Sequence, residues 1–231
     1  MRAHRTPIAV LVSGGLDSAV LLHRLLTRGH SIRPLYMRCG LSWEAVELYW
    51  LKRFLHVVRT PRLAPLVILD LPLASIYGKH WSMTGRQVPG ARSADRAVYL
   101  PGRNALLLTD AAVAAAQRNI STLAIGTLRS NPFSDASPRF FHLMERTLRE
   151  ALKRPIRILS PLRRLSKTAL VRSASRLPLR LTFSCLQPQG RRHCGRCNKC
   201  AERQRAFRSA GVFDPTTYVA SRFTLHASHS P

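Results

Sequence analysis

Short apolar runs and helical patterns alternate along most of the chain. Residues 8–12 form an apolar, β-branched run that predicts a buried strand. A glycine-containing turn follows at 13–18, then a helical pattern over 19–26 that Gly29 closes as a C-terminal cap. Further strands are predicted at 32–37, 66–71, 122–126 and 156–159. Further helices are predicted at 42–58, 104–117, 138–153, 167–176 and 199–210.

Regular alternation of strands and helices is typical of an open sheet covered on both faces. We therefore expect an α/β fold with a mostly parallel, five-stranded sheet of the Rossmann-like kind. Ser42 is a plausible N-cap of the second helix, with Glu44 in its first turn. Pro138 is suited to the first turn of its helix.

The pattern weakens in two places. Residues 72–100 are rich in Gly, Ser, Arg and Pro, and an irregular segment of that length is usually functional or mobile. After Pro178 the chain changes to cysteine-rich loops. We expect three parts: a nucleotide-binding domain over 1–178, a cysteine-rich lobe over 179–212 and a polar tail over 213–231.

Composition excludes several classes of protein. Apolar residues make up 45% of the 231 residues, which excludes disordered and low-complexity chains. No stretch approaches the roughly 20 apolar residues of a membrane span, and the charged start at residues 1–6 is unlike a secretory signal. The expected compartment is the cytoplasm.

The net charge is strongly positive. Thirty-seven Lys and Arg residues against 11 Asp and Glu give +26. Such a charge attracts polyanions, including nucleic acid and anionic small substrates. The arginines are scattered along the chain rather than gathered in one block, so compositional drift on a solvated surface is the favoured explanation and an electrostatic role is the alternative. A nucleic-acid partner is compatible with the sequence but not required by it.

The turn after the first strand has the composition of an anion site. The sequence Ser13-Gly14-Gly15-Leu16-Asp17-Ser18 lets the backbone approach phosphate oxygens, and the helix that follows adds free N–H groups. Asp17 is expected either to hold Mg²⁺ or to fix the N–H groups of the turn. The motif lacks the lysine of a Walker-type loop and the third glycine of a dinucleotide fold.

Four of the five cysteines lie within sixteen residues. Cys185, Cys194, Cys197 and Cys200 have the spacing C-x8-C-x2-C-x2-C, which suits tetrahedral Zn²⁺ in a structural site. An iron–sulfur cluster is the competing interpretation, and free or disulfide-bonded cysteines are the third. His193 is a candidate to replace one sulfur or to support the site from outside. Cys39 is expected to be a small buried apolar residue.

Several motifs together resemble one family. The turn at 13–18, the string Tyr99-Leu100-Pro101-Gly102-Arg103-Asn104, Ser160-Pro161-Leu162 with Lys167 behind it, and the cysteine cluster look like the 7-cyano-7-deazaguanine synthase family. The resemblance covers about residues 8–207. It implies an adenine-nucleotide α-hydrolase-like fold with a zinc-bound lobe. It also implies an ATP-dependent ligase that converts 7-carboxy-7-deazaguanine and ammonia to the nitrile.

The same resemblance implies site residues. ATP would contact Val12, Tyr36, Asn104 and the turn Ser13, Gly14, Gly15, Leu16, Asp17 and Ser18. Asp17, Arg103 and Lys167 would be catalytic. Arg103, Phe133 and Asp135 would bind the deazaguanine, although the stretch 131–137 departs from the family string. Three of these residues have a plain structural alternative. Arg103 would be a surface arginine, Lys167 a solvated lysine at a helix start, and Phe133 an aromatic anchor of its loop.

Two other functions share some of these features. A tRNA-modifying adenylating enzyme of the lysidine or thiolation type would have the same pyrophosphate-binding turn, and the positive charge favours it. A zinc-bound nucleic-acid module would have no need for that turn. The expected cofactors are ATP, Mg²⁺ and Zn²⁺, with small-molecule substrates and no membrane partner. A homodimer is left open.

Overall fold

Five parallel strands form the centre of the molecule. The computed structural model describes residues 7–174 and 176–219. The strands run in the order β3-β2-β1-β4-β5, and every neighbouring pair is parallel. Their bounds are Ile8–Leu11 (β1), Ile32–Arg38 (β2), Val67–Asp70 (β3), Thr122–Ala124 (β4) and Arg157–Leu159 (β5). The expected α/β class with a five-stranded parallel sheet is confirmed.

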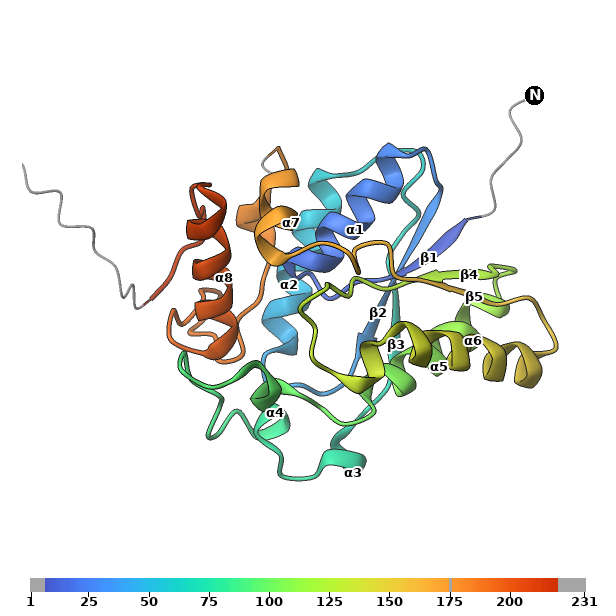
Figure 1. The fold of residues 1–231 in the computed structure, drawn as a ribbon, viewed down its shortest axis with the longest axis horizontal. Helices are drawn as coiled ribbons and strands as arrows, with labels where there is room; N and C mark the ends of the chain where they lie inside the picture. The colour runs from blue at the N-terminus through green and yellow to red at the C-terminus, as the bar shows by residue number, and fades with distance from the viewer. Residues whose placement is uncertain (1–6, 175, 220–231) are drawn as a thin grey trace, which may run out of the picture.

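Helices bury both faces of this sheet (Figure 1). The long helices are Leu16–Thr27 (α1), Glu44–Val57 (α2), Arg103–Ala116 (α5), Pro138–Leu152 (α6), Lys167–Ser173 (α7) and Asn198–Ala210 (α8). Successive residues of β1 enter two separate apolar cores. Ile8 and Val10 pack with α1, α2 and α7, whereas Ala9 and Leu11 pack with α5 and α6. A strand buried on both sides is the reason that β1 reads as a continuous apolar run.

The helix ends match the predictions from the sequence at some positions and differ from them at others. Ser137 Oγ accepts from Phe140 N, and Pro138 occupies the first turn of α6 as expected. Gly29 has a φ of +82° directly behind α1, which suits a residue without Cβ. The predicted N-cap at Ser42 is wrong, because α2 begins later and its end has no side-chain cap. Glu44 bonds the backbone N–H groups of the preceding loop instead.

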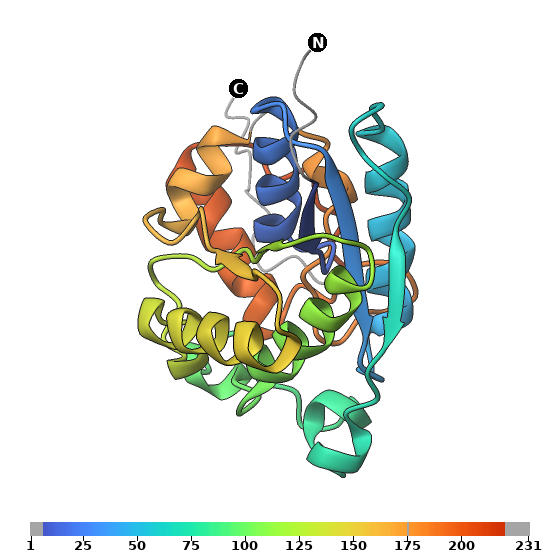
Figure 2. The ribbon, with the colours of Figure 1, turned by 90° about the vertical axis from the view of Figure 1, so that its right-hand side faces the viewer.

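The irregular segment before α5 contains two short helices, Ala74–Tyr77 (α3) and Trp81–Thr84 (α4), and the 3-10 turn Asp95–Val98. They lie at one end of the molecule (Figure 1, Figure 2). Asn198, the first residue of α8, holds this segment. Its N–H donates to Pro89 O at 2.8 Å, and its side-chain amide donates to Ser93 O at 2.8 Å. The cysteine-rich lobe is thus tied to the middle of the chain.

Some expectations lie partly or wholly outside the described residues. The charged start at 1–6 and the tail over 220–231 are among them, and the three-part division at 178 and 212 stays a prediction. Within the described part of the chain, no helix combines the length and the apolar content needed to cross a membrane.

Candidate nucleotide site and metal centre

Serine hydroxyls hold the turn between β1 and α1. Ser13 N donates to Ser18 Oγ at 3.2 Å, and Ser18 Oγ donates to Gly15 O at 3.1 Å. Ser13 Oγ accepts from Gly15 N at 3.4 Å. No side chain caps the start of α1. Because the first N–H groups of a helix have no partner within it, this end of α1 offers donors and partial positive charge to an anion.

Two glycines set the shape of the turn. Gly14 has a φ of +77°, and a Cβ there would lie 3.2 Å from Leu51 Cβ. Gly126, just after β4, approaches the start of α1 so closely that a Cβ would lie 3.2 Å from the carbonyl carbon of Asp17 and 3.3 Å from Ser18 N. The turn therefore lies at the carboxyl ends of β1 and β4, where the chain reverses its direction across the sheet and open α/β folds bind ligands.

Asp17 pairs with a lysine from α7. Lys167 Nζ lies 2.8 Å from Asp17 Oδ1 and 3.0 Å from Oδ2, and 3.4 Å from Glu202 Oε1. Burial lowers the pKa of Lys167, but the two carboxylates outweigh burial and raise it. Lys167 is therefore a firmly charged ammonium rather than a solvated lysine. In the described residues the hydroxyls of Ser13 and Ser18 accept from N–H groups of the turn, and Asp17 pairs with Lys167.

Asp135 and Asn104 join the loop before α6 to the start of α5. Asn104 N donates to Asp135 Oδ2, and the Asn104 amide donates to Asp135 O, both at 3.0 Å. Asp135 is buried, and its other oxygen, Oδ1, has no hydrogen-bond partner among the described residues. The Nε of Arg103 is likewise buried without a partner. Unpaired buried polar atoms are costly, so a donor and an acceptor left open here point to a ligand.

Phe133 stacks on Tyr99. Their ring centroids are 4.8 Å apart at an interplanar angle of 23°. Tyr99 Oη and Ser134 Oγ are within hydrogen-bond distance at 3.2 Å, and Phe133 N donates to Asn131 Oδ1 at 3.0 Å. Phe133 thus anchors its loop and also lines the cavity described below, so the two roles considered for it are compatible.

Glu47 is a cavity residue that motif matching missed. Its Oε1 accepts from Tyr36 Oη at 3.1 Å and its Oε2 from Trp43 Nε1 at 3.2 Å. Burial raises the pKa of Glu47 to about 7, and the nearby Arg103 guanidinium opposes that rise. Burial also raises the pKa of Tyr36, so its hydroxyl stays a donor. The only sequence signal was a glutamate four residues after Trp43, on the same side of a helix.

One cavity of about 330 Å³ gathers these elements at the carboxyl end of the sheet. Its wall includes almost every residue expected to bind nucleotide or substrate: Val12, Ser13, Gly15, Leu16, Asp17, Ser18, Tyr36, Arg103, Asn104, Phe133, Asp135 and Lys167. Gly14 shapes the turn without lining the cavity. The wall also includes Glu47, Thr127, Lys199 and Glu202, none of which was predicted.

The four clustered cysteines converge. The sulfur atoms of Cys185, Cys194, Cys197 and Cys200 all lie within 4.8 Å of one another, and all four residues are buried. Two of the separations are 3.9 and 4.0 Å. A tetrahedral ion with metal–sulfur bonds of about 2.3 Å requires sulfurs about 3.8 Å apart, so the set fits Zn²⁺ well.

Backbone N–H groups surround this cluster as they would surround thiolates. Cys185 Sγ accepts from Cys194 N at 3.2 Å, Cys194 Sγ from Cys197 N at 3.3 Å, and Cys197 Sγ from Cys200 N at 3.4 Å. Four sulfurs leave a tetrahedral ion no open position, so the site would be structural. His193 does not replace a sulfur, because its Nε2 accepts from Ser184 N at 3.1 Å.

Comparison with known proteins identifies the family. The family model described as "Queuosine biosynthesis protein QueC" matches residues 8–211. The chain belongs to this family. QueC membership confirms the resemblance drawn from the turn, the Pro-Gly-Arg-Asn string and the cysteines.

Individual relatives agree with QueC membership. The 7-cyano-7-deazaguanine synthase of Anaeromyxobacter dehalogenans (strain 2CP-C) is 32% identical over 225 residues, which cover 91% of this chain and 94% of that protein. The protein of the same name from Rhizobium leguminosarum bv. trifolii (strain WSM2304) is 33% identical over 227 residues, which cover 93% and 92%. A solved 4-thiouridine synthetase–RNA complex with bound ATP aligns with a TM-score of 0.49 at 16% identity, over 89% of this chain and 50% of that one.

Proposed function

We propose that this chain is an ATP-dependent ligase that converts 7-carboxy-7-deazaguanine and ammonia to 7-cyano-7-deazaguanine. The observation that carries the proposal is a single cavity. Its wall contains the phosphate-type turn, the buried Nε of Arg103 and the buried Oδ1 of Asp135, and these two atoms have no hydrogen-bond partner among the described residues. The names of the QueC relatives supply the substrate class.

The reaction divides into two activations. The substrate carboxylate attacks the α-phosphorus of ATP, pyrophosphate leaves, and ammonia then displaces AMP to give an amide and release a proton. The amide oxygen attacks a second ATP, pyrophosphate leaves again, and loss of AMP and the remaining N–H protons gives the nitrile. Each adenylation turns a poor leaving group into a good one. Positioning and electrostatic stabilisation are the expected sources of rate.

The chain offers a matched group for each part of the substrates. The turn at 13–18 and the start of α1 would hold the β- and γ-phosphates, with Lys167 beside them. Arg103 would bind the substrate carboxylate, because a guanidinium matches carboxylate geometry with two parallel hydrogen bonds. Asp135 Oδ1 would accept an N–H of the deazaguanine, and Phe133 would lie against its ring.

Two metals are expected, and they fit differently. The four cysteines would hold Zn²⁺ as a structural ion that stabilises the lobe around α8. For Mg²⁺, the carboxylate of the phosphate-type turn itself is Asp17, and its oxygens already pair with Lys167. The ion would therefore rely on phosphate oxygens and water, as Mg²⁺ commonly does, and would shield phosphate charge.

The direct test is purified protein with ATP, ammonia and 7-carboxy-7-deazaguanine, followed by mass spectrometry of the product and measurement of AMP. Nitrile and AMP formation are expected from the wild type. Asp17→Ala should retain the fold by circular dichroism and lose AMP formation. AMP formation that depends on added tRNA rather than on the deazaguanine would contradict the proposal and favour a tRNA-modifying enzyme.

A further inference from the structure

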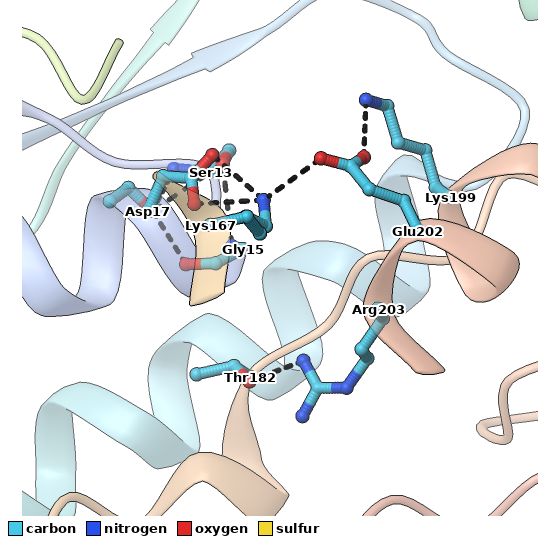
Figure 3. A network of polar contacts seen from close by, with 9 residues as sticks. Ser13, Gly15, Asp17, Lys167, Thr182, Lys199, Glu202 and Arg203 are labelled. Carbon is cyan, nitrogen blue, oxygen red and sulfur yellow. Dashed lines mark hydrogen bonds and ion pairs between the residues drawn. The ribbon is translucent and has the colours of Figure 1, made fainter. Parts of the chain in front are cut away.

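Helix α8 brings two charged side chains from the cysteine-rich lobe into the nucleotide cavity. Lys199 lies on the first turn of this helix and Glu202 on the next, and both line the same cavity as the turn after β1. Glu202 lies between Lys199 and Lys167, which comes from α7 (Figure 3). The two helices pack against each other in the fold, so this contact does not depend on a loose segment.

The four charges alternate in sign. Asp17 pairs with Lys167 at 2.8 Å, Lys167 with Glu202 at 3.4 Å, and Glu202 with Lys199 at 2.7 Å (Figure 3). Glu202 therefore uses one oxygen for each lysine, Oε1 for Lys167 and Oε2 for Lys199. A single carboxylate in this position fixes the distance between two ammonium groups.

Both lysines keep donors for a ligand. A lysine ammonium carries three N–H donors and no acceptor. Asp17 and Glu202 occupy part of this capacity on Lys167, whereas Glu202 is the only carboxylate paired with Lys199 among the described residues. An anion in the cavity can therefore accept hydrogen bonds from both lysines without breaking any of the existing pairs.

An ordinary surface pair in the same protein shows the contrast. Glu150 of α6 and Lys153, which directly follows that helix, are also three residues apart, but the side chains of Lys153 and Glu150 are 76% and 78% exposed. The side chains of Lys199 and Glu202 are only 31% and 22% exposed. Ion pairs exposed to water contribute little to protein stability. Charges at the wall of a partly closed cavity are screened less by solvent and therefore act more strongly on a ligand.

We propose that Lys199 is a second phosphate-binding lysine and that Glu202 is the positioning residue that holds Lys199 and Lys167 together. The proposal rests on the proposed binding of ATP at the turn after β1. It means that the cysteine-rich lobe contributes part of the nucleotide site. The ligand class is a polyphosphate, here the β- and γ-phosphates of ATP and the pyrophosphate that leaves.

The first experiment measures dissociation constants of ATP, inorganic pyrophosphate and AMP by isothermal titration calorimetry. Lys199→Gln should raise the dissociation constants of ATP and pyrophosphate roughly tenfold, the loss expected for one charge-assisted hydrogen bond. The dissociation constant of AMP should change less than twofold. Lys199→Arg should keep ATP binding because it keeps the cation. Lys153→Gln, which breaks the exposed pair at the same spacing, should change none of the three.

The second experiment separates positioning from simple attraction. Glu202→Gln removes a negative charge, so pyrophosphate should bind at least as tightly as to the wild type. The turnover number for AMP release should nevertheless fall roughly tenfold, since the two lysines lose their common partner. If the ion pair were merely structural, Glu202→Gln would lower the thermal midpoint. It would not combine unchanged or tighter binding of pyrophosphate with a lower turnover number.

The outcomes are distinguishable. If the wild type binds ATP and pyrophosphate and Lys199→Gln binds both equally well, the role of Lys199 is wrong while the proposed ligase function stands. The role is also wrong if Lys199→Gln loses AMP as strongly as pyrophosphate, or loses zinc and thermal stability together. If the wild type binds neither ATP nor pyrophosphate, the ligase proposal itself fails.

Discussion

Glu47 is half-buried and accepts hydrogen bonds from two neutral donors. Tyr36 and Trp43 each donate to one of its oxygens, and Arg103 lies close enough to lower its pKa. Burial outweighs these contacts, so the pKa of the carboxyl rises from 4.5 to about 7. At neutral pH this residue is therefore close to half protonated, next to the cavity in which ammonia would react.

Glu47→Gln is expected to change how stability depends on pH. Between pH 4.5 and 7 the folded wild type keeps a proton that the unfolded chain has lost, so its free energy of unfolding falls as pH rises. The loss in the free energy of unfolding should reach roughly 3 kcal/mol. The variant lacks this titration but loses about 1 kcal/mol at every pH, because the amide nitrogen that replaces one carboxylate oxygen cannot accept from the donor that faces it. Urea unfolding at pH 5 and pH 8 measures both effects. Parallel stability curves for the two proteins would contradict the raised pKa.

Arg103→Lys tests the guanidinium whose Nε has no partner among the described residues. Lysine keeps the charge but cannot form two parallel bonds to a carboxylate, so the KM for 7-carboxy-7-deazaguanine should rise roughly tenfold or more. The dissociation constant of ATP should change less than twofold. Arg146→Lys, on an exposed part of α6, is the matched control. Steady-state kinetics with each substrate varied in turn gives both values, and a selective loss of ATP binding would place Arg103 at the phosphates instead.

At the scale of elements, the site depends on how closely β4 approaches α1. Gly126 makes that approach through its missing Cβ, whereas Gly90 in the segment before α5 has no atom within 4 Å of an added Cβ and no positive φ. The two glycines therefore differ in what an alanine would meet.

Gly126→Ala should displace the start of α1 by a few tenths of an ångström. We expect a loss of about 1–3 kcal/mol in the free energy of unfolding and weaker binding of pyrophosphate. Gly90→Ala should be neutral or slightly stabilising, because alanine restricts the unfolded chain. Thermal unfolding with and without pyrophosphate measures both variants. Equal behaviour of the two would show that the close approach is unimportant.

Local sequence patterns predicted the helices, the strands and the short motifs. The site residues that these patterns missed depend on contacts between residues far apart in the sequence. The strands follow from apolar runs because β1 is buried on both faces, and Pro138 marked the start of α6 correctly. The turn at 13–18 and the cysteines were visible because their residues are near one another in sequence. Asp17 and Lys167 are 150 residues apart, so their pairing could not be derived from spacing. Glu47 and Glu202 looked like ordinary helical glutamates for the same reason.

At the scale of the whole molecule, the cysteine cluster should control stability. Cys194→Ser should remove about one zinc ion per chain and lower the thermal midpoint by several degrees, since metal binding contributes directly to folding. Cys39→Ala is the matched control, because Cys39 is equally buried but lies outside the cluster. Metal analysis and differential scanning calorimetry test the pair. Full zinc content in Cys194→Ser, or iron in the wild type, would contradict a four-cysteine zinc site.

The two bonds from Asn198 have a further consequence for shortened versions of this protein. A chain truncated after Pro178 would retain every strand of the sheet, so it would pass for a complete nucleotide-binding unit. It would nevertheless leave the carbonyls of Pro89 and Ser93 without their amide partner, and the segment before α5 without its attachment. Deleting the last quarter of the chain would thus remove the hydrogen bonds that hold a segment about a hundred residues upstream. A fragment that still folds would therefore lack part of the structure of the full-length enzyme.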